Sequence, residues 1–281
     1  MSSIDDTQLI KAQTFKALHE RPGTFVFPNP WDAGSAKILA HLGYEALATT
    51  SAGLAFSIGK PDGTGDVNRQ ETLQNAQTIV SATALPVAAD LENGYGDDPE
   101  ACATTLLLAA QAGLVGGSIE DATGRPDDPI YPFELSVARV KAAVQAVRSL
   151  PFPFTFTARA ENMLYGRDDL KDTIRRLEAY AEAGADVLYA PGLKTKEEIA
   201  AVVKAVAPRP VNVLLGVTAE NITVADLAAL GVKRISMGSL LARAAYGAFL
   251  QAAQELRHQG TVTFGEQTVP YATFNALFSG A

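Results

Sequence analysis

The chain has 281 residues, about the size of one α/β barrel, which typically needs about 250. Hydrophobic residues make up 47% and charged residues 19%, the ordinary balance of a globular protein with a large core. A formal net charge of −8 argues against nucleic acid or an anionic membrane as a partner, so an anionic substrate would need a local cation. The only cysteine, Cys102, excludes an intrachain disulfide and suits a reducing cytoplasm.

The N-terminal residues lack the basic start and the apolar stretch of a signal peptide. No apolar run approaches the ~20 residues of a membrane span. We therefore expect a cytoplasmic protein without a membrane partner. Residues 4–20 are typical of an amphipathic helix, which Arg21-Pro22-Gly23 ends. Its apolar positions are Ile4, Leu9, Ile10, Phe15 and Leu18.

From residue 24 onward, short apolar runs alternate with helical segments rich in Ala and Leu. The runs that are typical of strands are 24–27, 46–50, 86–90, 117–120, 154–159, 187–190, 211–214 and 234–237. Helices are predicted near 33–42, 68–83, 98–112, 134–149, 168–183, 195–206, 222–230 and 239–258.

This alternation predicts the fold class. Nearly continuous apolar strands indicate a parallel sheet buried on both faces, and regular alternation with helices indicates an α/β protein. Eight units favour a closed (β/α)₈ TIM barrel, preceded by the extra helix at 4–20, over an open doubly wound sheet. The open sheet lacks support because Gly94-Tyr95-Gly96 misses the third glycine of a phosphate-binding loop. Without a linker or a shift in composition, we expect one domain over residues 1–281.

Carboxylates gather at the ends of two neighbouring strands. Asp90 and Glu92 end the third strand, and Glu120 ends the fourth. The active site of such a barrel lies at the carboxyl ends of its strands, where like charges this close repel unless a cation holds them. Oxygen ligands select a hard cation, so these residues predict a Mg²⁺ or Mn²⁺ site. The alternative is that the acids only cap helices and solvate loops.

Arg159 ends the fifth strand and needs an anionic partner. That partner could be Glu161, a carboxylate of the cluster, or a substrate carboxylate held by two hydrogen bonds. Ser51-Ala52-Gly53 follows the second strand and suits an anion or oxyanion pocket, although the same residues form ordinary turns. The loop 121–133 is long enough to be a lid or a binding loop.

Several absences narrow the chemistry. The three histidines His19, His41 and His258 fall in predicted helices, so imidazole acid–base catalysis is not expected. The strands carry no lysine, which argues against a Schiff-base aldolase. Cys102 falls in a helix, where a buried structural thiol is expected.

Taken together, these residues resemble a known family. Ser51-Ala52-Gly53, the segment Asp90–Gly96 (Asp-Leu-Glu-Asn-Gly-Tyr-Gly), Ile119-Glu120-Asp121 and Ala158-Arg159 occur in the order and spacing of the isocitrate lyase/phosphoenolpyruvate mutase superfamily. The resemblance extends from Phe27 to about Ala248. The Asp-x-(Asp/Glu)-x-Gly-Tyr-Gly segment followed by Glu-Asp is its most specific part.

The resemblance implies a barrel whose last helix is swapped with a neighbouring subunit in a homodimer or homotetramer. It implies Mg²⁺, or Mn²⁺ in its place, bound directly by Asp90 and mostly through water by Glu92 and Glu120. Arg159 would neutralise a developing enolate, and Asn212 would approach the substrate carboxylate. The substrate-binding set implied is Ser51, Ala52, Gly53, Asp90, Arg159 and Asn212. The catalytic set implied is Arg159, Asp90 and Glu120.

Members of the superfamily cleave or form a C–C or P–C bond next to a 2-oxo acid. The loop at 122–129 lacks the Lys-x-Cys-Gly-His of isocitrate and 2-methylisocitrate lyases. Ala122 replaces the first lysine of the P–C branch, and Tyr189-Ala190-Pro191-Gly192 stands where that branch has a histidine. The resemblance therefore favours the branch of oxaloacetate decarboxylase-like and carboxyvinyl-carboxyphosphonate phosphorylmutase-like proteins.

From the residues and the resemblance we expect a Mg²⁺-dependent C–C lyase that forms an enolate from a small 2-oxo- or 2-hydroxy-dicarboxylate. It would be similar to oxaloacetate decarboxylase or to 2-methylisocitrate and dimethylmalate lyases. One alternative is a P–C bond enzyme that acts on phosphonopyruvate. Another is a barrel that binds a 2-oxo acid without turning it over.

Overall fold

The structure, a computed structural model, describes residues 6–217 and 220–279. Its strands are β1 (Phe25–Phe27), β2 (Leu47–Ala48), β3 (Val87–Asp90), β4 (Gly116–Glu120), β5 (Thr155–Arg159), β6 (Val187–Tyr189), β7 (Val211–Leu214) and β8 (Arg234–Ser236). Its helices are α1 (Asp6–Glu20), α2 (Ala33–His41), α3 (Ser51–Ser57), α4 (Arg69–Ser81), α5 (Pro99–Gln111), α6 (Phe133–Arg148), α7 (Leu170–Glu182), α8 (Lys196–Val206), α9 (Val224–Ala229), α10 (Leu240–Gln259), the 3₁₀ helix η1 (Thr263–Gln267) and α11 (Tyr271–Ser279).

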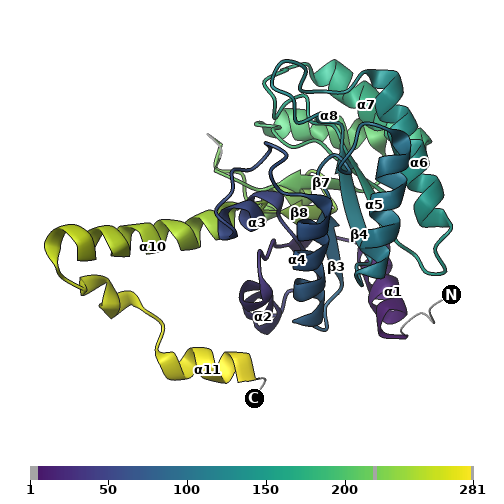
Figure 1. Ribbon diagram of the computed structural model, residues 1–281. Helices are drawn as coiled ribbons and strands as arrows, with labels where there is room; N and C mark the ends of the chain where they lie inside the picture. Colours follow the sequence, from purple (N-terminus) through teal and green to yellow (C-terminus); the bar gives the residue numbers. More distant parts are fainter. Residues whose placement is uncertain (1–5, 218–219, 280–281) are drawn as a thin grey trace.

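All strand pairs are parallel, in the order β1-β8-β7-β6-β5-β4-β3-β2. A backbone hydrogen bond of 3.0 Å from the Ala48 N–H to the Pro28 oxygen joins β2 to the residue after β1, so the two edges of the sheet meet. The strands lie at the centre and helices surround them (Figure 1). The predicted (β/α)₈ TIM barrel is therefore confirmed, with a nearly closed sheet.

Strand register brings the candidate chemistry together. Glu120 lies directly opposite Arg159 in the β4–β5 ladder, and Arg159 lies opposite Tyr189 in the β5–β6 ladder. Asp90 ends β3 opposite Ser118 of β4. Parallel strands all end at the same rim of the barrel, so these side chains share one face of the molecule.

The second strand is shorter than its predicted span of 46–50. It ends at Ala48, although the Thr49 N–H still donates to the Ala88 carbonyl of β3 at 3.0 Å. Thr49 Oγ1 accepts a hydrogen bond of 3.0 Å from the Asp90 N–H, and Thr50 Oγ1 accepts one of 3.3 Å from the Gly53 N–H. Thr50 thereby begins the short helix α3, which was not among the predicted helices.

The N-terminal helix α1 covers the opposite end of the barrel. Gln8 Nε2 donates to the carbonyls of Ala110 and Leu114, just before β4, at 2.8 and 3.0 Å. Phe15 is fully buried and lies over Gly116, where an added Cβ would come within 2.8 Å of its ring. The extra helix is thus confirmed from Asp6 onward, while Ile4, its first predicted apolar position, lies outside the described residues.

The C-terminal helices leave the barrel. Figure 1 shows α10 projecting away from the strands and α11 returning below α2. Only Ala242 of α10 is buried, whereas Phe249 and Leu250 are 71% and 56% exposed. Lys37 of α2 donates to the Phe278 carbonyl of α11 at 3.2 Å. The predicted helix 239–258 is present, and its exchange with a neighbouring subunit stays a prediction.

In the described part of the chain, no helix combines the length and the apolar composition needed to cross a membrane.

Candidate active site

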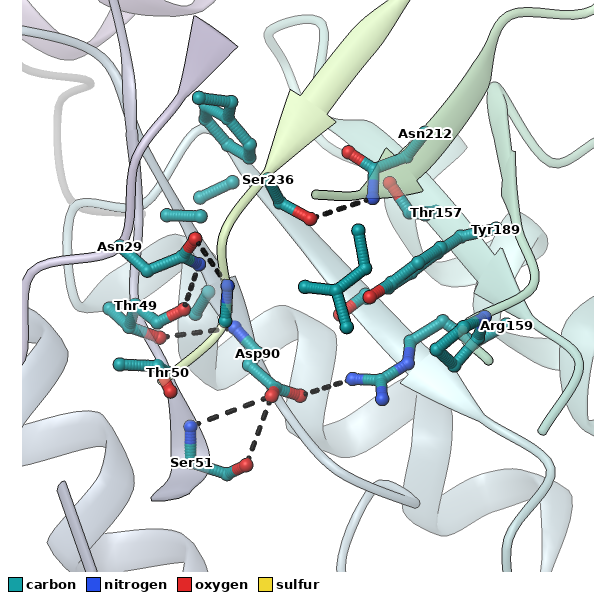
Figure 2. A pocket seen from close by; sticks show the side chains of 18 of the residues that line it. Asn29, Thr49, Thr50, Ser51, Asp90, Thr157, Arg159, Tyr189, Asn212 and Ser236 are labelled. Atoms are coloured by element: carbon teal, nitrogen blue, oxygen red, sulfur yellow. Dashed lines mark hydrogen bonds and ion pairs between the residues drawn. The ribbon is translucent and has the colours of Figure 1, made fainter. Parts of the chain in front are cut away.

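A cavity of about 240 Å³ opens among the carboxyl ends of the strands. Figure 2 shows Asp90, Ser51 and Arg159 on one side of it, and Asn212 and Ser236 on the other. Its position agrees with the rule that barrel enzymes place their sites at this rim. Ser51, Ala52, Asp90, Arg159 and Asn212 of the predicted substrate-binding set line the cavity. Gly53 is buried behind it, with its N–H donated to Thr50.

Asp90 is held in place from three sides. Its Oδ2 accepts a hydrogen bond of 3.1 Å from the Ser51 hydroxyl, and its Oδ1 accepts one of 2.8 Å from Arg159 Nη1 (Figure 2). The Glu92 N–H approaches the same Oδ1 at 3.3 Å. Asp90 therefore presents a carboxylate of fixed orientation to the cavity.

Arg159 binds three carboxylates at once. Nη1 contacts Asp90 at 2.8 Å, Nη2 contacts Glu120 at 2.9 Å, and Nε contacts Glu161 at 2.8 Å. The side chain of Arg159 is 10% exposed, and that of Glu161 is 1% exposed. Burial of this kind requires paired charges, and the three carboxylates supply them. Two of the partners considered from the sequence, Glu161 and the carboxylate cluster, therefore contact Arg159. The third, a substrate carboxylate, stays a prediction.

Glu92 and Glu120 lie toward a neighbouring groove rather than the cavity itself. Burial and repulsion from Asp90 and Asp62 raise the pKa of Glu92 to about 7. Burial likewise raises the pKa of Glu120 well above its usual range, against the attraction of Arg159. Glu92 also has a φ of +46°, an uncommon backbone conformation for a residue with a side chain.

The carboxylates do not form a ready-made metal centre. Within residues 6–217 and 220–279, no group of three or more His, Cys, Asp or Glu side chains is arranged to hold a metal ion. Arg159 lies between Asp90 and Glu120 and contacts both. The donor set still fits a hard divalent cation, because it consists of oxygen atoms and carries more negative than positive charge.

Two acidic residues of the site were not predicted as ligands. Asp62 lies in the loop after α3 and lines the cavity with Asp90. Burial and the Asp90 carboxylate raise its pKa. Glu161 was considered only as a partner of Arg159, and its Oε2 is buried without a hydrogen-bond partner among the described residues. Asp62 gave no signal because it lies far from any strand end, in a stretch rich in Gly.

A buried arginine on α6 anchors the segment that carries Asp90 and Glu92. Arg139 is 1% exposed and donates to the carbonyls of Asn93, Gly96 and Asp97. Its guanidinium lies over the ring of Tyr131 at 4.2 Å from the ring centroid. Arg139 thus holds the loop after β3 through its backbone carbonyls. No role for Arg139 was predicted from the sequence.

The three histidines do not line the cavity. His19, His41 and His258 lie in α1, α2 and α10. Cys102 is fully buried in α5, and its thiol lies 3.9 Å from the Asn93 carbonyl. Neither imidazole nor thiol chemistry is available at this rim of the barrel from these four residues.

Barrel and site together define a class: a (β/α)₈ protein with a carboxylate cluster and one arginine at the ends of β3, β4 and β5. The chain matches the family model described as phosphoenolpyruvate phosphomutase over residues 15–257. It therefore belongs to this family, within the isocitrate lyase/phosphoenolpyruvate mutase superfamily. The resemblance seen in the sequence is confirmed.

Three comparisons illustrate the relationship. A crystal structure from Burkholderia cenocepacia J2315, described as a candidate lyase or mutase, is 58% identical and has a TM-score of 0.94, covering 98% of this chain and 97% of that one. Oxaloacetate acetylhydrolase in complex with oxalate is 27% identical, with a TM-score of 0.86 and 95% and 93% covered. Oxaloacetate decarboxylase of Bradyrhizobium diazoefficiens is 29% identical over 77% of this chain and 74% of its own length. The chain is thus an enzyme of the lyase/mutase type.

Proposed function

We propose that the chain is a Mg²⁺-dependent lyase that cleaves a C–C bond next to the 2-oxo group of a small dicarboxylate and forms an enolate. Oxaloacetate is the first substrate to test, because two of the similar proteins carry its name. The observation that carries the proposal is the pairing of Asp90 with Arg159 at the wall of a cavity of about 240 Å³. A cavity of this size accommodates a small acid.

In oxaloacetate, breaking the bond between C3 and the C4 carboxylate releases CO2 and leaves the electron pair on C3. This pair is shared with the oxo oxygen as an enolate, which a proton then converts to pyruvate. Arg159 would stabilise the negative charge of the enolate, because its guanidinium lines the cavity beside Asp90. Ser51 and Ala52 would hold the substrate carboxylate at the start of α3. A bound Mg²⁺, held directly by Asp90 and through water by Glu92 and Glu120, would supply Lewis acidity.

The test is a panel of diacids followed by ¹H NMR in the presence of Mg²⁺, with a chelator as the control. We expect oxaloacetate, or a related 2-oxo- or 2-hydroxy-diacid, to yield pyruvate or another small 2-oxo acid. We expect the Asp90→Ala variant to lose this turnover. Absence of turnover for every diacid of the panel would contradict the proposal.

A second candidate, P–C bond chemistry on phosphonopyruvate, is favoured by the description of the matching family model. ³¹P NMR tests this candidate. Formation of phosphate or phosphoenolpyruvate from phosphonopyruvate would favour P–C bond chemistry over the lyase proposal. A third reading, a barrel that binds a 2-oxo acid without turning it over, would be supported by Mg²⁺-dependent binding of oxalate with every activity assay silent.

A further inference from the structure

A second buried arginine lies at the inner end of the cavity. Arg234 begins β8, is 4% exposed, and lines the same cavity as Asp90 and Arg159. Its Nε donates to Asn212 Oδ1 at 2.9 Å, and its Nη2 donates to Thr157 Oγ1 at 3.0 Å. Its Nη1 lies 3.3 Å from His19 Nε2 of α1.

None of the described partners of Arg234 is a carboxylate. The three contacts are an amide, a hydroxyl and an imidazole, and the ring of Phe27 lies 4.7 Å from its guanidinium carbon. The imidazole is a neutral acceptor, because His19 Nδ1 lies 2.8 Å from the Phe15 carbonyl and donates to it. Burial lowers the pKa of Arg234 to about 9, which expresses the cost of an uncompensated buried cation.

Other buried arginines of the barrel are satisfied differently. Arg159 meets three carboxylates, and Arg176 meets Asp121 and Asp172. Arg139 meets three backbone carbonyls. Arg234 has neither, and its three contacts leave two of its five N–H groups for a further acceptor.

The cavity runs from the acidic rim to this cation. At the rim, Asp90 and Asp62 make the wall acidic, and each nitrogen of Arg159 already contacts a protein carboxylate. Deeper in the barrel, Ala48 and Ala88 contribute only small side chains, so that the space reaches Arg234. A ligand that fills the cavity would meet acidic side chains at the rim and a cation, Arg234, at the inner end.

We propose that Arg234 binds the distal carboxylate of a dicarboxylate substrate whose 2-oxo-acid end lies at Asp90. The inference rests on the proposed function, and it adds the residue that recognises the second carboxylate of the substrate. An incoming carboxylate supplies the negative charge that Arg234 lacks, and Asn212 and Thr157 hold the guanidinium toward it. Arg234 is thus a specificity-determining residue: it selects acids with two charged ends over acids with one.

The experiment compares matched ligands in Mg²⁺ buffer by calorimetry. The pair 2-oxoglutarate and 2-oxovalerate, and the shorter pair oxaloacetate and 2-oxobutyrate, each differ in the distal carboxylate. We expect the wild type to bind the better diacid at least about tenfold more tightly than its monoacid, since hydrogen bonds to a charged group contribute about 1.5–3 kcal/mol. Equal affinities within both pairs would overturn the proposal without any variant.

The Arg234→Gln variant then tests whether Arg234 causes the preference for diacids over monoacids. It should lose the diacid preference while its affinity for oxalate, which reaches only the rim, stays within about twofold. Arg175→Gln is the control, because it makes the same substitution at an exposed arginine of α7 that does not line the cavity; it should leave the preference intact. A preference that survives in Arg234→Gln, or an equal loss of diacid and oxalate, would overturn the role of Arg234.

These measurements separate the inference from the proposed function. If the wild type prefers diacids through Arg234 but converts none of them, the inference stands and the lyase proposal fails. If diacids are cleaved with no contribution from Arg234, the lyase proposal stands and the inference fails. If Arg234→Gln does not fold, the wild-type comparison and a Thr157→Val variant, which should reduce the preference, still decide.

Discussion

Arg159 is the residue on which the candidate site is organised, since it contacts acids from β3, β4 and the segment after β5. A lysine keeps the charge but cannot reach Asp90, Glu120 and Glu161 together. We expect Arg159→Lys to lower kcat by about 10²–10³-fold, the usual effect of losing a charge-stabilising donor. Steady-state kinetics check this, with the exposed Arg175→Lys as the control. Unchanged kcat in Arg159→Lys would remove Arg159 from the chemistry.

His19 makes a separate prediction about stability. Burial, followed by the charge of Arg234, lowers its pKa from 6.5 to about 3 in the folded chain. Protonation therefore favours the unfolded chain, so this contribution is complete above pH 6.5 and is lost as the pH falls toward 3. The contribution of His19 to the free energy of unfolding changes by at most about 1.4 kcal/mol per pH unit. Urea unfolding between pH 4 and 7 should show a weaker pH dependence for His19→Gln than for the exposed His41→Gln; identical profiles would refute it.

At the residue scale, the sequence could predict side chains that end strands. Asp90, Glu120 and Arg159 come together because the register of a parallel barrel brings strand ends to one rim. It could not predict Asp62 or Arg139, because their places depend on a loop path and a helix rotation. It also could not show that Arg159 would bind three carboxylates, which depends on rotamers.

At the scale of elements, α3 shows how a local signal can mislead. No helix was predicted at Ser51-Ala52-Gly53, where an anion pocket or an ordinary turn was expected, yet the residues begin a helix because Thr50 caps it. The strands and the longer helices were predicted to within a few residues, since their apolar periodicity spans whole elements. Helices η1 and α11 were missed because their apolar residues do not face the core: no residue of either is buried.

Gly53 tests the packing of α3 against the barrel rim. A Cβ there would lie 2.5 Å from Thr50 Cγ2 and 2.9 Å from Trp31 Cβ, both closer than atoms can pack. We expect Gly53→Ala to destabilise the fold by about 1–3 kcal/mol in urea unfolding. Gly34→Ala in α2 is the control, because its nearest contact is an ordinary 3.5 Å and alanine favours helix. Equal stability of the two variants would contradict the packing described.

At the scale of the whole molecule, the C-terminal region carries exposed apolar surface. Phe249 and Leu250 on α10 and Tyr271 on α11 are 71%, 56% and 82% exposed. Apolar patches of this kind commonly mark an interface between subunits. Light scattering should therefore give a dimer or tetramer of the 29.6 kDa chain, and Phe249→Asp should shift it toward smaller species. A monomer mass for the wild type at micromolar concentration would refute this.

The barrel itself was predictable because eight repeated units leave few ways to bury so many apolar strands. The path of the last helices could not be predicted from the sequence. A helix that leaves its own barrel has the same apolar periodicity as a helix that packs against the barrel. One domain over residues 1–281 stays a prediction, and a single cooperative unfolding transition would support it.

We propose that Asp90 and its neighbours hold a divalent cation that also binds a 2-oxo acid. Water-proton relaxation measures Mn²⁺ binding to the protein directly, with and without oxalate. We expect oxalate to tighten Mn²⁺ binding to the wild type and to Asp127→Asn, an exposed loop control, and we expect Asp90→Asn to weaken Mn²⁺ binding about 100-fold or more. Equal Mn²⁺ binding by the wild type and Asp90→Asn, or oxalate binding unaffected by a chelator, would contradict it.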